Sequence, residues 1–123
     1  MKIFISPLPK PDWAVDKDVF IETLKTNWKE VIINKIEDES RKYSFTWSIT
    51  QNGTDVLEGK LDKDGSTFVL ESEDYLLLYK CSLYCREFMP STAHIIFYDE
   101  NYSFNLELND ELSEKDFIDS FLA

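Results

Sequence analysis

Apolar and polar residues alternate along much of the chain, a pattern typical of β-strands that bury one face. The clearest example is residues 43–50, in which every second side chain is apolar: Tyr43, Phe45, Trp47 and Ile49. Small hydroxyl residues occupy the positions between them, so we expect that face to meet water. Alternation also predicts a strand at residues 102–108, and apolar residues on one face predict another at residues 2–6. Residues 30–37 are rich in β-branched residues with both faces partly apolar, which predicts a strand there, and we expect a further strand at residues 94–98.

Three segments show helical periodicity instead. The first follows Asp16, a good N-cap residue, and runs to about Asn27. The second covers residues 73–88, with Ser72 as its predicted cap, and a short third helix starts at Ser113. With two more strands that follow residues 43–50 in a meander, at about residues 54–61 and 68–70, the element order is β-α-β-β-β-β-α-β-β-α. It predicts an α+β fold, mainly an antiparallel sheet of about six to seven strands with helices packed on one face.

Two glycine-containing turns predict a three-stranded meander in the middle of the chain. The first is read as a three-residue loop, Gln51-Asn52-Gly53, and the second as a two-residue type I′ turn at Asp64-Gly65. The resulting cross-strand neighbours are Trp47 with Leu57, Phe45 with Gly59, Tyr43 with Leu61, Leu61 with Phe68, and Gly59 with Leu70. Both turns keep the same face apolar, which supports the predicted register.

The length and the charge of the chain narrow the classes of function. With 123 residues, the chain is predicted to form a single domain, residues 1–123. The formal net charge is -11, and residues 99–123 carry eight acids and one Lys, whereas residues 1–36 carry six Lys and five acids. Such a surface repels phosphate backbones, so nucleic-acid binding is not expected. The acidic end either attracts a basic protein as partner or serves only to keep the protein in solution.

The residues that carry redox, metal or catalytic chemistry are few. Cys81 and Cys85 lie one helical turn apart, where a disulfide would strain the helix, and the only histidine is His94. A zinc site needs four ligands, so we expect both thiols to pack in the core and predict no metal or cofactor. No nucleophile motif or phosphate-binding loop is present, which makes an enzyme the less favoured class.

The start of the chain predicts no targeting segment. Its short apolar run ends at Pro7 and is too brief for a secretory signal or a membrane span. Because the two cysteines form no disulfide framework, we expect a cytoplasmic protein without membrane association.

Two segments carry aromatic residues that are candidates for binding a partner. Trp13 ends a stiff segment with three prolines, where it either packs back on the sheet or anchors a partner. The second segment is a predicted hairpin tip in which two tyrosines flank two acids: Tyr98, Asp99, Glu100 and Tyr102. This segment is either a solvated hairpin tip or a contact with a partner, for which tyrosine supplies contact area at low entropic cost and the carboxylates pair with Arg or Lys.

Three hypotheses of function follow. The first is a non-enzymatic protein-binding module, for example a bacterial immunity- or antitoxin-like protein that engages a basic partner. The alternative is a small enzyme or small-molecule-binding protein with a pocket between helices and sheet, lined by Phe45, Trp47 and Phe104. A third is a homo-oligomeric structural protein, in which an uncovered strand edge or sheet face pairs with a second copy to give a homodimer.

Overall fold

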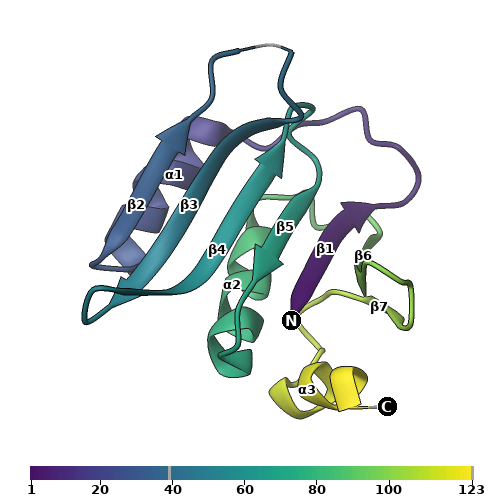
Figure 1. Ribbon diagram of the computed structural model, residues 1–123. Helices are drawn as coiled ribbons and strands as arrows, with labels where there is room; N and C mark the ends of the chain where they lie inside the picture. The colour runs from purple at the N-terminus through teal and green to yellow at the C-terminus, as the bar shows by residue number, and fades with distance from the viewer. Residues whose placement is uncertain (39, 123) are drawn as a thin grey trace.

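The computed structural model describes residues 1–38 and 40–122, which form a seven-stranded sheet and three helices (Figure 1). In chain order the elements are β1 (Lys2–Pro7), α1 (Lys17–Asn27), β2 (Val31–Lys35), β3 (Tyr43–Gln51), β4 (Thr54–Asp62), β5 (Phe68–Glu71), α2 (Tyr75–Glu87), β6 (Ile95–Asp99), β7 (Asn105–Glu107) and α3 (Glu114–Leu122). All strand pairs are antiparallel, so the predicted α+β class and the predicted element order are confirmed.

The strands lie in the order β2-β3-β4-β5-β1-β6-β7, so the first strand of the chain is inserted between β5 and β6. Ile3 and Ile5 of β1 are fully buried, as a central strand requires. Helices α1 and α2 cover one face of the sheet and leave the other face open (Figure 1). The Phe117 ring of α3 stacks on Phe97 of β6 and meets Tyr79 of α2 edge-on, so α3 packs at the β6 end of the core.

The first helix begins as predicted, but the second does not. Asp16 caps α1 through its side chain, which accepts a hydrogen bond from the Val19 N–H. The cap of α2 is Asp74 rather than the predicted Ser72. The Ser72 hydroxyl is buried and donates to the Val56 carbonyl at 2.5 Å, so it ties the loop before α2 to β4.

The first hairpin turn is tighter than predicted. Gln51 pairs with Thr54, and Asn52 and Gly53 both have positive φ (54° and 78°), which is a two-residue type I′ turn. A bulge follows between Ile49 and Thr50, and it shifts the ladder beyond the turn. The predicted register was therefore wrong by two residues for Phe45 and Trp47, which leaves the same face buried. Tyr43 is opposite Asp62 rather than the predicted Leu61, beyond a second irregularity in the ladder, and the Lys60 ammonium lies 5.1 Å from the centre of its ring.

The corrected register places Trp47 opposite Gly59 and Phe45 opposite Leu61. An aromatic ring does cover Gly59, as expected, but it is the indole of Trp47: a methyl group on Gly59 would lie 2.7 Å from the Trp47 Cη2 atom. The next ladder is as predicted, with Leu61 opposite Phe68 and Gly59 opposite Leu70. Glycine is required at position 59 because no space remains for a side chain.

The second turn keeps its predicted register with a different geometry. Gly65 has φ of 75°, whereas Asp64 does not have the positive φ of a type I′ turn. The Asp62 carboxylate accepts the backbone N–H groups of Ser66 and Thr67 at 2.9 and 3.1 Å. Of the strand predicted at residues 102–108, only Asn105–Glu107 forms a strand, β7. Tyr102 has a left-handed backbone, with φ of 53°, and so cannot continue an extended strand.

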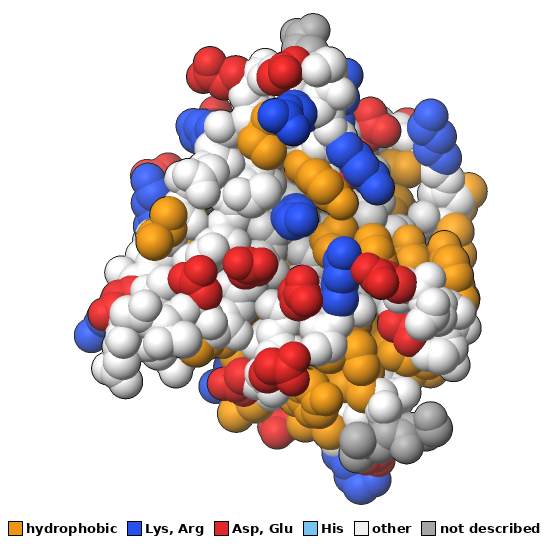
Figure 2. All heavy atoms as spheres, viewed as in Figure 1, with side chains coloured by type: hydrophobic (Ala, Val, Ile, Leu, Met, Phe, Trp, Pro, Cys, Tyr) orange, Lys and Arg blue, Asp and Glu red, His pale blue; other side chains and the backbone are white. Residues whose placement is uncertain are grey.

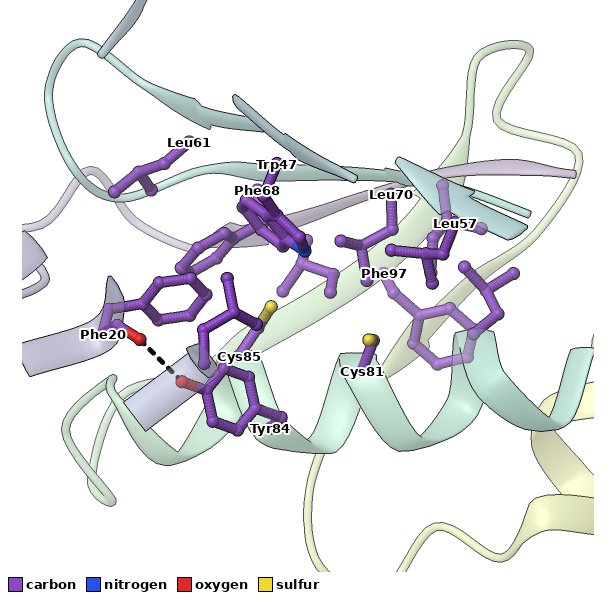
Figure 3. Packing of buried hydrophobic residues seen from close by; sticks show 14 of the residues in the cluster. Phe20, Trp47, Leu57, Leu61, Phe68, Leu70, Cys81, Tyr84, Cys85 and Phe97 are labelled. Atoms are coloured by element: carbon purple, nitrogen blue, oxygen red, sulfur yellow. Dashed lines mark hydrogen bonds between the residues drawn. The ribbon is translucent and has the colours of Figure 1, made fainter. Parts of the chain in front are cut away.

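Phe20 of α1 is fully buried in the hydrophobic core between helices and sheet (Figure 3). Its ring lies within 5.0–5.7 Å of five other aromatic rings: Phe45, Trp47, Phe68, Tyr84 and Phe88. The Tyr84 hydroxyl of α2 donates to the Phe20 carbonyl at 2.7 Å. Phe20 therefore contacts both the sheet and α2, alongside the other buried residues of the two helices.

Gly59→Ala is expected to destabilise the fold by about 1–3 kcal/mol, because the added methyl group overlaps the Trp47 indole. In a Trp47→Leu background the same substitution is expected to cost less, since the smaller side chain vacates that space. Urea unfolding of the wild type, both single variants and the double variant measures this coupling. An equal cost in both backgrounds would show that the two positions do not compete for space.

Candidate functional site

The face of the sheet beneath the helices is filled by side chains. Phe45 and Trp47 are each about 1% exposed and pack against Phe20. Phe104 lies apart from them and packs against Phe97 and Phe121. The three residues therefore do not line a common pocket, and the small-molecule alternative gains no support from them.

The buried cysteines of α2 behave as apolar core residues. Cys81 and Cys85 are free and fully buried (Figure 3). Burial raises the pKa of the Cys81 thiol to about 12, and burial also raises the pKa of Cys85 well above its ordinary value. The described residues contain no group of His, Cys, Asp or Glu suited to hold a metal ion. His94 is half-exposed at the sheet end and contacts Glu107 at 3.0 Å.

Because their thiolate forms are strongly disfavoured, both cysteines are expected to react with an aromatic disulfide reagent at pH 8 at least about 100-fold more slowly than an exposed thiol. Ser40→Cys, in an exposed loop, supplies that reference thiol in the same protein. Absorbance of the released thiolate follows the reaction, and denaturant should abolish the difference. Fast native labelling of Cys81 or Cys85 would contradict their placement in the core.

The open face of the sheet carries three stacked aromatic rings, which we call the aromatic ladder: Phe4, Tyr98 and Tyr102. Phe4 of β1 is directly opposite Tyr98 of β6, and their rings stack at 5.5 Å. Tyr102 stacks on the Tyr98 ring at 4.7 Å with an interplanar angle of 7°. Figure 2 shows apolar side chains gathered on the right of this face, with acidic side chains across its lower half. The ladder is an aromatic surface on the open face of the sheet.

The loop after β6 holds Tyr102 in its exposed position. Tyr102 is 66% exposed and has the left-handed φ of 53°, which is costly for a residue with a bulky side chain. Asp99 shapes the loop: its backbone carbonyl accepts the Tyr102 N–H, and its carboxylate accepts the N–H and hydroxyl of Ser103. The Ser103 hydroxyl lowers the pKa of Asp99, which keeps this carboxylate ionised. Asp99 is thus a positioning residue in this loop.

Glu100 already binds a cation from its own chain. The Lys2 ammonium lies 2.9 Å from the Glu100 carboxylate and 5.8 Å from the centre of the Phe4 ring. The hydrogen bond to Glu100 raises the pKa of Lys2. The Lys2 ammonium therefore contacts the Glu100 carboxylate and the face of the Phe4 ring at the same time.

Trp13, the remaining predicted site residue, lies away from the ladder. It is half-buried, packs against the core, and lines a shallow groove of about 250 Å³ with Pro7, Asp64 and Thr67. A chain of hydroxyl groups joins the two regions: Tyr98 Oη lies 2.9 Å from Ser6 Oγ, which lies 3.3 Å from Thr67 Oγ1. The structure thus brings Tyr98, Glu100 and Tyr102 together and places Trp13 at the other end of β1.

Two further features were missed from the sequence: Phe4 on the open face, and an acidic groove between β4 and the segment that leads from β5 into α2. The groove, of about 530 Å³, is lined by five acids: Asp55, Glu58, Glu71, Glu73 and Asp74. Glu58 and Glu71 are directly opposite each other, and Glu71 is also opposite Lys2. Like charges placed opposite each other destabilise a sheet. The predicted pairing of Gly59 with Leu70 already implied that Glu58 is opposite Glu71. The position of Lys2 opposite Glu71 was not predictable in this way, because it depends on where β1 lies in the sheet.

No helix within residues 1–38 and 40–122 is both long enough and apolar enough to cross a membrane. Comparison with known protein families, curated proteins and solved structures finds no match for this chain. Function must therefore be inferred from the chemistry of the chain itself.

Asp99→Asn is expected to lower the thermal unfolding midpoint at pH 7, because Asn cannot replace the charged acceptor of the Ser103 hydrogen bonds. The folded pKa of Asp99 lies below its ordinary value of 3.8, so its contribution is present above that pH and is lost as the pH falls through the folded pKa. The difference between variant and wild type should therefore shrink below about pH 4.

Asp12→Asn is the matched control, since it removes one exposed carboxylate far along the chain from this loop. Calorimetry at pH 7 and pH 3 measures all three proteins. A midpoint difference for Asp99→Asn that is the same at both pH values would show that the carboxylate does not stabilise the loop.

Proposed function

We propose that this protein is a non-enzymatic module that binds a basic protein through the aromatic ladder and the acids beside it. The observation that carries the proposal is Tyr102, which is 66% exposed in a left-handed backbone conformation. Gly or Asn would suit this loop position at lower cost. A tyrosine that is kept there despite the strain is best explained by a use for its exposed ring.

The chemistry next to Tyr102 favours a cationic partner. The Glu100 carboxylate binds the Lys2 ammonium. Tyr102 stacks on Tyr98 as the last ring of the ladder and is itself exposed. An arginine of a partner fits this arrangement, because its guanidinium stacks on an aromatic face while it pairs with a carboxylate. Tyrosine and arginine are also the residue types that dominate binding energy at protein interfaces.

The charge of the whole chain supports the same partner. A net charge of -11 attracts a basic protein from a distance and speeds association at low salt. The same field disfavours nucleic acid as a ligand. An immunity- or antitoxin-like protein of a bacterium, which blocks a cationic toxin, is one concrete form of this function. The cytoplasm is its proposed location, where free thiols such as Cys81 and Cys85 stay reduced.

Affinity capture from a bacterial lysate tests the proposal when the wild type and Tyr102→Asn serve as paired baits. Asn tolerates positive φ, so the variant should keep its loop and its unfolding midpoint while it loses the exposed ring. We expect the wild type to retain a basic protein that salt releases, and Tyr102→Asn to retain at least about tenfold less of it.

Val19→Asn is the control bait, because it replaces a side chain that is 48% exposed on α1, away from the open face. It should capture as much partner as the wild type. A captured protein that binds wild type and Tyr102→Asn equally, or that is acidic, would refute the proposed surface.

A further inference from the structure

The strand β2 forms an edge of the sheet, with β3 on one side and no strand of this chain on the other within the described residues (Figure 1). The hydrogen bonds to β3 determine which backbone groups remain outside. Thr50 N–H bonds the Glu30 carbonyl and Ile36 N–H bonds the Ser44 carbonyl, so the even-numbered residues of β2 face β3. The N–H and C=O groups of residues 31, 33 and 35 therefore point away from the sheet.

This edge carries few of the devices that usually protect one. Proteins commonly place lysine or other charges, proline or bulges on an exposed edge strand, or make the strand very short. Of these, β2 has one charged residue, Lys35 at its end, and no proline. The register of β2 with β3 is regular, and its first three residues are Val31, Ile32 and Ile33. Ile32 is 55% exposed on the open face. The opposite edge, β7, is by contrast only three residues long.

We propose that β2 pairs with β2 of a second copy of this chain, antiparallel and centred on Ile33, to form a continuous sheet across a homodimer. In this register Ile33 meets its own copy and Val31 meets Lys35 of the second copy. All the outward backbone groups of residues 31, 33 and 35 then find partners at once. A register shifted by two residues leaves part of the strand unpaired.

The charges at both ends of the strand are complementary in this register. Lys29 precedes β2 and Glu37 follows it, and both side chains are exposed. Antiparallel pairing centred on Ile33 places Lys29 of each copy opposite Glu37 of the other. Two-fold symmetry repeats the contact, so each dimer contains it twice.

Helix α1 adds a second complementary contact. Asp18 of α1 lies 4.0 Å from Lys35, which places its side chain toward β2. Lys25 follows Asp18 by two helical turns and therefore lies on the same side of α1. A two-fold axis through the paired strands runs the two copies of α1 antiparallel, with Asp18 of one toward Lys25 of the other. This edge also belongs to residues 1–36, the part of the chain with slightly more Lys than acids, so self-association there avoids the acidic end.

Sedimentation velocity of the full chain over a range of micromolar concentrations tests the dimer. The wild type is expected to dimerise, and Lys29→Glu or Glu37→Lys alone to raise the dimer dissociation constant by about tenfold, since each reversal sets like charges opposite each other twice. The double variant Lys29→Glu with Glu37→Lys restores opposite charges and is expected to return to the wild-type constant within about threefold.

Two further variants separate this edge from other surfaces. Lys35→Pro removes an outward N–H and leaves the hydrogen bonds to β3 intact, so it should abolish the dimer without loss of folding. Tyr102→Asn should leave the dimer unchanged, which keeps this result independent of the proposed partner surface. A monomeric wild type, or a dimer indifferent to the single charge reversals, would overturn the proposal.

Discussion

The packing of the Phe20 ring against the sheet and against α2 is the contact on which the rest of the molecule depends. Five aromatic rings surround it: two from β3, one from β5, and two from α2 and its C-cap residue. The Tyr84 hydroxyl satisfies the Phe20 carbonyl in the same place. Because these side chains fill the layer between helices and sheet, the aromatic richness of that face is structural. Recognition chemistry is left to the open face, the loops and the strand edges.

The two faces of the sheet therefore have different physical roles. The covered face gains stability from apolar burial, and even its cysteines have raised pKa values that suppress their chemistry. The open face accepts features that cost stability: a tyrosine in a left-handed conformation, and two glutamates directly opposite each other. Both of these features lie on the surface that the proposed function uses, and the covered face has its own unfavourable group, the buried Trp47 Nε1, for which the described residues offer no hydrogen-bond partner.

Asp99 shows how a residue that looks like a contact from the sequence acts as a positioning group in the structure. Its charge and its neighbours predict an interface acid, yet its carboxylate accepts two hydrogen bonds from Ser103 and its carbonyl accepts one from Tyr102. Glu100, one residue later, is 57% exposed and binds Lys2. Two adjacent acids of similar chemistry thus differ because one is inside the turn and the other outside it.

Local sequence determined the secondary elements, because periodicity, caps and turn residues act within a few positions of one another. Asp16 as a helix cap, the Leu61–Phe68 register and the element order were all predictable in this way. The errors were also local: the Asn52-Gly53 turn needed only two residues, and a bulge then moved Trp47 opposite Gly59. Such a bulge lies outside the turn and leaves no sequence signal of its own.

Tertiary structure alone decided what lies beside what on the open face. The aromatic ladder exists because β1 pairs with both β5 and β6, which brings Phe4 to Tyr98 and Lys2 to Glu100 across almost the whole length of the chain. The sequence identified Tyr98, Glu100 and Tyr102 as neighbours along the chain and Phe4 not at all. Pairing over such separations is set by how the complete core closes, and turn chemistry specifies only adjacent strands.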